Sequence, residues 1–323
     1  MESMIAAGAL LAILSGVMNG SFTLPMRFLG RWEWENVWSL FIVSSCLLLP
    51  VAIVCSTAPE SWSLLREAPA HAVWIAIVTG FAWGFGAIMF GQSVSAIGIS
   101  LANTFVLAIS SALGSLLPLL ILSPAKLFQH TGRMIVLGVL IEIVGIVICG
   151  KAGSMREKAV GLGAKAERGD LVGKARPLGV ALLLVIGSGI LSAVFNIGFS
   201  LAQPLADYGR SAGLSQFAST NLIWIVMLAA GSVANLGFCL YLLFKNRSTE
   251  KFVQRGSARL YLLALVMGLL WGGSIFVYGA AAPRLGALGT SIGWPLSLAA
   301  GLLVANGIGL ALGEWRHAPQ RAR

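Results

Sequence analysis

Residues 14–24 read LSGVMNGSFTL, and residues 191–201 read LSAVFNIGFSL. Six of the eleven positions are identical at an offset of 177 residues, among them Asn19 and Asn196. A second match has an offset of 188 residues, at which Gly80, Trp83, Gly84, Gly91 and Gly98 recur as Gly268, Trp271, Gly272, Gly279 and Gly286. Because the shared residues include Asn and Trp in the same order, the two matches indicate that the chain consists of two related halves.

Both copies of the repeat lie within long apolar segments. Of the 323 residues, 57% are hydrophobic and 11% are charged, whereas an average soluble domain is about 25% charged. A membrane span needs roughly 20 mostly apolar residues, and nine such runs occur at 4–24, 36–55, 72–92, 99–122, 133–150, 177–201, 217–244, 259–281 and 287–312. Lipid does not tolerate unpaired backbone groups, so each run is predicted to be a helix. The chain is therefore expected to be an all-α integral membrane protein.

The basic residues fall mainly on one side of the predicted membrane. Assigning the loops alternately to the two sides places 17 Lys and Arg residues on one side and five on the other. By the positive-inside rule the richer side is cytoplasmic, and the N-terminus lies outside. The net charge of +10 is therefore a topology signal and does not indicate nucleic-acid binding. Asn246-Arg247-Ser248 forms a glycosylation sequon, but its loop lies on the predicted cytoplasmic side.

The two halves are expected to have opposite orientations in the membrane. Five spans lie in the first half, 1–150, so the second copy enters from the opposite face. Such an inverted repeat is common among secondary transporters. Residues 151–176, which are rich in Lys and Arg, are interpreted as a mobile cytoplasmic linker, and the second half, 177–323, has four spans. The 188-residue offset would place a tenth helix at about 321–338, so this helix is expected to be missing from the chain.

Uncharged polar side chains recur on several of the predicted helices. Ser15 and Asn19 are four residues apart and share one face of the first helix, and Ser192 and Asn196 repeat that face in the sixth. Asn103 belongs to a similar polar stripe in the fourth helix. Because lipid offers no partner to these groups, they are expected to line a wet cavity that binds a substrate. The alternative is hydrogen bonding between helices.

The chain contains ten Trp residues, which divide into two groups. Those near predicted span boundaries are interpreted as interfacial anchors: Trp32, Trp34, Trp38, Trp62 and Trp315. Trp83 and Trp271 lie inside spans, and each is followed by a Gly that clears space beside the indole. An indole face against the C–H face of a sugar, with amides serving its hydroxyls, predicts a carbohydrate site. Core packing is the alternative interpretation of both residues.

Glu142 is the only charged residue deep inside a predicted span. An ionised carboxylate at that depth costs roughly 2–4 kcal/mol on insertion scales, so an acid there is a functional hypothesis. Because desolvation disfavours its charged form, such a group can take up and release a proton. Glu142 is accordingly a candidate for proton coupling. The alternative is a protonated or paired structural residue at a helix interface.

The chain offers little for catalysis or metal binding. Its three His residues are far apart, and its four Cys residues lie in or at the ends of apolar runs without a CxxC motif. Residues 289–293, GTSIG, match the G-x-S-x-G nucleophile motif but lie in a predicted membrane helix and not at a strand-to-helix turn. Neither an enzyme, a metal site nor a cofactor is expected.

Several motifs resemble a known family. Residues 32–39, WEWENVWS, resemble the W-x-W-E-x-x-W-S signature of L-rhamnose–proton symporters, within the drug/metabolite transporter superfamily. Similar segments are Trp83-Gly84 with Gly91 and Gly98, Gly132-Arg133-Met134 with Gly138 and Gly145, Asn235-Leu236-Gly237-Phe238-Cys239, and Glu314-Trp315. Together these segments extend over almost the whole chain.

The resemblance implies two inverted five-helix repeats, of which this chain has nine helices, with the first four of each repeat around a central cavity. It implies proton-coupled uptake of L-rhamnose or a related sugar across a bacterial inner membrane by alternating access. The partners would be the sugar, the proton and the bilayer, with a homodimer as a further possibility. Glu35 matches the signature and is a second candidate for proton coupling, although an acid there also complements a helix N-terminus. Glu142 matches no motif of the family.

Two other functions remain open at this point. One is a facilitator or exporter of another small polar metabolite. The other is a membrane subunit that does not transport. The repeat with its polar faces favours transport.

Overall fold

A computed structural model describes residues 2–97, 99–159, 177–313, 315–316 and 318–322, and within these ranges the chain is helical. Among the described residues, eight segments are long and apolar enough to cross a membrane: Glu2–Met26, Trp34–Thr57, Ala70–Ser93, Leu101–Leu122, His130–Arg156, Leu178–Ser211, Gln216–Lys245 and Ser257–Ala311. The last one has 55 residues and contains two long helices. The expectation of an all-α membrane protein is confirmed.

The first half begins with α1 (Glu2–Ser21), a short 3₁₀ turn η1 (Leu24–Phe28) and α2 (Trp34–Ile42). It continues through η2 (Val43–Leu48), α3 (Leu49–Thr57), α4 (Ser61–Glu67), α5 (Ala70–Ile97), α6 (Ile99–Leu122), η3 (Pro124–Lys126) and α7 (His130–Ala159). Helix α7 extends nine residues beyond the expected end at 150, so the expected linker begins as helix. Its remaining residues, 160–176, lie outside the described residues.

The second half consists of α8 (Leu178–Leu201), α9 (Gln203–Ser211), α10 (Gln216–Lys245), η4 (Ser248–Val253), α11 (Ser257–Ala281), η5 (Ala282–Leu288), α12 (Gly289–Ala311) and η6 (Gln320–Ala322). The G-x-S-x-G motif forms the first turn of α12. It is therefore part of a helix, as expected, and not a nucleophile elbow.

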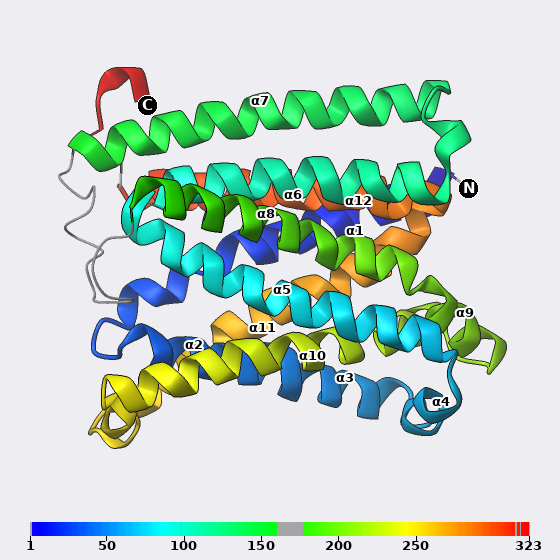
Figure 1. Cartoon of the computed structure of the whole chain (residues 1–323), viewed down its shortest axis with the longest axis horizontal. Helices are drawn as coiled ribbons and strands as arrows, with labels where there is room; N and C mark the ends of the chain where they lie inside the picture. Colours follow the sequence, from blue (N-terminus) through cyan, green and yellow to red (C-terminus); the bar gives the residue numbers. More distant parts are fainter. Residues whose placement is uncertain (1, 98, 160–176, 314, 317, 323) are drawn as a thin grey trace.

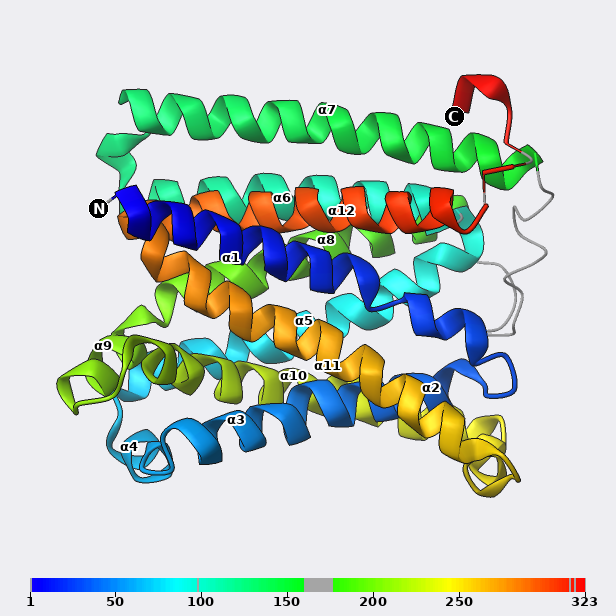
Figure 2. The ribbon, with the colours of Figure 1, turned by 180° about the vertical axis from the view of Figure 1, so that it is seen from behind.

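The long helices lie side by side, with α7 along one edge of the bundle (Figures 1 and 2). Their connections gather at two ends. We call one the basic end; it contains residues 22–33 and 246–256. The opposite end contains residues 58–69, 202–215 and 282–288.

The two halves interleave instead of forming separate domains. Helix α1 packs on α11 and α12, whereas α8 packs on α5 and α6. Helix α5 also packs on α10, through the small residues of a GxxxG pair. A Cβ atom on Gly80 would lie 2.2 Å from the carbonyl oxygen of Met227, and one on Gly84 would lie 2.5 Å from that of Gly231. The close helix packing expected from this spacing is therefore present.

The second expected span, 36–55, is not one regular α-helix. Residues 43–48 form a π-helical segment, in which the N–H of Leu49 donates to the carbonyl of Ser44, five residues earlier. The hydroxyl of Ser45 donates to the carbonyl of Phe41, 2.6 Å away, which satisfies an acceptor that regular helix would have paired. Pro50 follows directly, and it has no N–H to continue the ladder. Irregular turns of this kind are frequent at functional sites.

Candidate functional site

A partly open cavity of about 150 Å³ lies between helices of both halves. An apolar protein cavity of that volume holds a six-membered ring such as benzene. Its lining residues are Phe22, Trp38, Phe41, Trp83, Gly86, Ala87, Phe90, Val106, Ser188, Ser192 and Trp271. The wall is thus mainly aromatic with two hydroxyl groups, and it suits a small ligand that has both an apolar face and hydroxyls.

Trp83 of α5 and Trp271 of α11 form one wall of the cavity. Their rings are stacked, with centroids 5.1 Å apart and 12° between the planes. Both indoles are half-buried, so each keeps part of its surface toward the open space. The structure therefore places both of the tryptophans proposed for a sugar site in one cavity.

Trp38 also lines the cavity, and its interpretation as an interfacial anchor was wrong. Its Nε1 donates to Oδ1 of Asn235 on α10 at 3.1 Å, and Asn235 donates to the carbonyl of Gly84 at 3.2 Å. The same correction applies to Trp32, which is buried and donates to the carbonyl of Lys251 at 3.0 Å. Hydropathy places both tryptophans at the end of a predicted span. In the structure α10 covers Trp38, and the loop after α10 covers Trp32.

The serines proposed for the site divide between the cavity and the helix interfaces. Ser192 lines the cavity, and its Oγ lies 3.0 Å from Oγ of Ser110 on α6. Ser15 is buried outside the lining, where its Oγ lies 3.0 Å from Oγ of Ser297 on α12 and donates to the carbonyl of Ser274. Ser188, one turn before Ser192, also lines the cavity and donates to the carbonyl of Gly86 at 2.8 Å.

Asn196 is fully buried in a helix interface and is not in the cavity lining. Its Nδ2 donates to the carbonyls of Gly114 at 2.7 Å and Thr290 at 3.3 Å, and its Oδ1 accepts from the hydroxyl of Tyr278 at 2.5 Å. Every polar atom of the amide is thus used within the bundle. For this residue, hydrogen bonding between helices describes the observed contacts.

Because Asn19 and Asn196 are repeat-equivalent, an inverted repeat predicts that a pseudo-two-fold axis brings the two amides together at mid-membrane. That prediction is wrong, since Asn19 lies far from Asn196. Nδ2 of Asn19 is 3.8 Å from the position of a Cβ on Gly301, whereas Asn196 binds Thr290, eleven residues earlier on α12. At a rise of 1.5 Å per residue, Thr290 and Gly301 are about 16 Å apart along the axis of α12, and so are the two amides that lie beside them. Asn103 is exposed and also lies outside the lining, although Val106, one turn later on α6, is part of it.

Glu142 faces α6 and not the cavity. Ser111 donates a short hydrogen bond to its Oε2, while its Oε1 is buried without a hydrogen-bond partner among the described residues. Helix α7, which carries Glu142, lies at the edge of the bundle (Figure 1). The carboxyl group therefore connects two neighbouring helices of the same half.

Glu35 is almost completely buried, with 1% of its surface exposed, at the basic end. Its Oε1 accepts from Nδ2 of Asn246 at 3.0 Å and from Oγ of Ser248 at 2.6 Å. Neighbouring Asn36 donates to the carbonyl of Ser248 at 2.9 Å, and Lys251 forms an ion pair with Glu33. Residues 32–39, the WEWENVWS segment, thus contact the loop between α10 and α11. The two polar side chains of the sequon, Asn246 and Ser248, both donate hydrogen bonds to Glu35.

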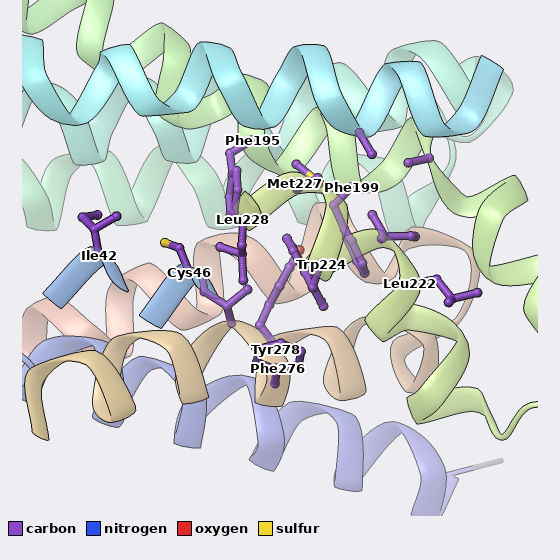
Figure 3. Packing of buried hydrophobic residues seen from close by; sticks show 14 of the residues in the cluster. Ile42, Cys46, Phe195, Phe199, Leu222, Trp224, Met227, Leu228, Phe276 and Tyr278 are labelled. Atoms are coloured by element: carbon purple, nitrogen blue, oxygen red, sulfur yellow. The ribbon is translucent and has the colours of Figure 1, made fainter. Parts of the chain in front are cut away.

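The cavity lies in the half of the bundle nearer the basic end. Its lining includes residues of α2, of the second half of α5 and of the first half of α6, which lie toward that end, together with residues from the middle of α8 and α11. Toward the opposite end the same bundle is filled by a buried aromatic group that includes Phe195, Phe199, Trp224 and Tyr278 (Figure 3). The space is consequently closed on one side.

Comparison with known proteins gives one consistent result. The model of the family described as L-rhamnose-proton symport protein (RhaT) matches residues 1–323. The chain is 27% identical to the L-rhamnose-proton symporter of Klebsiella pneumoniae subsp. pneumoniae, over 99% of this chain and 93% of that protein. It is 26% identical to the one of Salmonella dublin and 27% identical to the one of Cronobacter sakazakii, over 99% of this chain and 93% and 92% of those proteins.

Proposed function

The chain belongs to the L-rhamnose-proton symport protein family, and from this premise we propose that it is a proton-coupled transporter of L-rhamnose or a related sugar. The named relatives are symporters and not enzymes, and they match along almost their whole length. The observation that carries the proposal for this chain is the cavity between the halves, with its stacked tryptophans and its serine hydroxyls.

The cavity wall suits a 6-deoxy sugar. Such a sugar presents C–H groups and a methyl group on one side and hydroxyls around its edge. The parts of the Trp83 and Trp271 rings that their stacking leaves exposed can contact the apolar side, and the hydroxyls of Ser188 and Ser192 can exchange hydrogen bonds with the sugar. Pockets of this composition, mostly aromatic with a few placed polar groups, are typical of small-molecule sites.

We infer that the two halves are inverted repeats and that transport proceeds by alternating access. Equivalent contacts support this. Ser15 and Ser192 are repeat-equivalent, and each lies 3.0 Å from a serine hydroxyl, that of Ser297 on α12 or of Ser110 on α6. The packing of α1 on α11 and α12 corresponds to the packing of α8 on α5 and α6. A cavity between such halves, open on one side, is the arrangement that rocking of one half against the other requires.

The charge distribution supports an orientation in a bacterial inner membrane. The basic end has most of the Lys and Arg residues and is assigned to the cytoplasm, with the N-terminus in the periplasm. In this orientation the cavity opens toward the cytoplasm. The structure then corresponds to the state that releases sugar into the cell.

We propose Glu35 in preference to Glu142 as the proton-coupling residue. Glu35 joins α2 of the first half to the α10–α11 loop of the second, through donors that are neutral. Trp38, three residues later on the same helix, lines the cavity. Protonation of Glu35 would therefore change a contact between the halves close to the sugar. Glu142 bonds within one half, on a helix at the edge of the bundle.

Uptake of labelled L-rhamnose into membrane vesicles tests the proposal. With an inward proton gradient the vesicles should accumulate the sugar above its external concentration, and an uncoupler should abolish that accumulation. Uptake that equilibrates but ignores the gradient would indicate a facilitator. Uptake of other solutes only would refute the sugar assignment.

A further inference from the structure

The aromatic residues at the closed end of the bundle are buried and contact one another. The rings of Phe199 and Trp224 are stacked, with centroids 4.2 Å apart and 7° between the planes. Tyr278 lies 5.8 Å from the first ring and 6.2 Å from the second, and all three residues are at most 1% exposed. Figure 3 shows these side chains converging from α8, α10 and α11.

Two members of this group are repeat counterparts of cavity-lining residues by the offsets of the sequence matches. Phe199 corresponds to Phe22 at 177 residues, and Tyr278 corresponds to Phe90 at 188 residues. Phe22 and Phe90 are partly exposed and line the open cavity. The same two positions of the repeat are thus open in one half of the bundle and closed in the other.

One pair of equivalent glycine contacts aligns Trp224 with Trp38. Gly84 of α5 contacts the carbonyl of Gly231, and its repeat-equivalent Gly272 contacts the carbonyl of Ser45. These contacts align α10 with the α2–η2 segment at an offset of 186 residues, which pairs Trp224 with Trp38. Trp38 lines the cavity, whereas Trp224 is completely buried.

The equivalent glycines Gly91 and Gly279 also differ in how closely other residues pack against them. A Cβ atom on Gly279 would lie 2.2 Å from Nε1 of Trp224, so that this indole lies directly against the α11 backbone. A Cβ atom on Gly91, its counterpart on α5, would meet nothing within 4 Å. The space beside this glycine is open in the first half and filled by a tryptophan in the second.

The indole N–H of Trp224 is left without a partner. Nε1 is buried and makes no hydrogen bond among the described residues. Its counterpart, Nε1 of Trp38, donates to Asn235. A buried donor without a partner is costly, so it points to an acceptor that is present in another state of the protein.

We propose that Phe199, Trp224 and Tyr278 form a second, latent sugar-binding surface, which lines a cavity open to the opposite face when the present cavity closes. The inference rests on the proposed function, because it assigns the sugar contacts of the state that loads substrate. The indole N–H of Trp224 and the hydroxyl of Tyr278 donate to sugar hydroxyls, and the rings cover its C–H face. In the closed state Tyr278 donates instead to Asn196, which ties α11 to α8.

Substitution of Trp224 by Phe removes the indole N–H together with part of a buried ring system. Because the side chain is completely buried, Trp224→Phe should also lower the melting temperature, so KM is measured well below that temperature. Loss of one hydrogen bond to a neutral group should raise the KM for sugar entering from the periplasmic face about twofold to tenfold. Trp74→Phe, on an exposed residue of α5, is the control and should leave KM unchanged. An unchanged KM in Trp224→Phe would overturn the assignment.

The accessibility of introduced cysteines to a thiol reagent tests the latent cavity independently of sugar transport. Ser15 is the buried counterpart of the cavity residue Ser192. In a background with Ala at Cys46, Cys55, Cys149 and Cys239, a membrane-impermeant maleimide should label Ser192→Cys from the cytoplasmic face and Ser15→Cys from the periplasmic face. Ser15→Cys that stays unlabelled from both faces would overturn the latent cavity. A protein that shows both labelling patterns but no rhamnose uptake would refute the proposed substrate while supporting the second cavity.

Discussion

The indoles of Trp83 and Trp271 stack on each other with their centroids 5.1 Å apart. The two residues are 188 positions apart and occupy equivalent places in the two halves. If the halves are inverted repeats, as proposed above, equivalent residues that touch each other lie on the axis that relates the halves. Because this pair also lines the cavity, a ligand bound there contacts both halves simultaneously. A relative motion of the halves must therefore change the surroundings of the ligand.

Replacing Trp83 by Leu should weaken sugar binding. The substitution removes one ring of the stacked wall, and aromatic contacts of this kind contribute about 0.5–1.5 kcal/mol, or roughly twofold to tenfold in apparent affinity. Trp74→Leu is the matched control, since Trp74 is on the same helix but 63% exposed, away from the cavity. Concentration-dependent uptake measures both. Equal KM values for the two variants would exclude Trp83 from the sugar site.

Asn196 and Asn19 should differ in their effect on stability, although the repeat relates them. Asn196→Ala leaves the hydroxyl of Tyr278 and the carbonyl of Gly114 without their partner, which costs about 1–3 kcal/mol. It should lower the melting temperature in detergent by several degrees. Asn19→Ala removes a partly exposed amide that lies against Gly301 and should change it little. A larger destabilisation by Asn19→Ala would contradict the observed contacts.

The helices were predictable because a span in lipid has a required length and must satisfy its own backbone. Each of the nine apolar runs is helical in the structure. Hydropathy does not report the π-helical segment 43–48, since its side chains are as apolar as those of the regular helix around it. Nor does it detect the end of α7 at Ala159, because residues 151–159 include four charged residues and are not apolar enough to extend a predicted span.

The cavity lining was predictable where the repeat itself carried the signal, and it was not predictable where the packing of neighbouring helices decides which residues face the cavity. Trp83, Trp271 and Ser192 stood out because both copies share them, and they line the cavity. Helical spacing gave the face on which Asn196 lies but not which helix packs against that face. Trp38 could have been found from its spacing to Phe41, which places both on one side of α2. Its position near a boundary suggested the interface instead.

The GxxxG pair of α5 gives a prediction about helix packing. A Cβ atom on Gly84 would lie 2.5 Å from a backbone carbonyl of α10, so Gly84→Ala must separate the two helices and should destabilise the protein by about 1–3 kcal/mol. Gly138 of α7 is exposed and would have nothing within 4 Å of a Cβ atom. Gly138→Ala should therefore be neutral or stabilise by up to about 1 kcal/mol. Thermal unfolding in detergent compares them, and equal melting temperatures would refute the close contact.

Replacing Glu35 and replacing Glu142 should have opposite effects on proton-coupled accumulation of the sugar. Glu35→Gln keeps an oxygen that can accept from Asn246 and Ser248 but replaces the carboxyl group by an amide. If Glu35 takes up the coupling proton, this variant should lose gradient-driven accumulation while still exchanging labelled for unlabelled sugar across the membrane. Glu142→Gln changes a contact with Ser111 within one half and should retain accumulation. Counterflow and pH-driven uptake in the same vesicles separate exchange from coupling. Accumulation that survives in Glu35→Gln and disappears in Glu142→Gln would transfer the coupling role to α7.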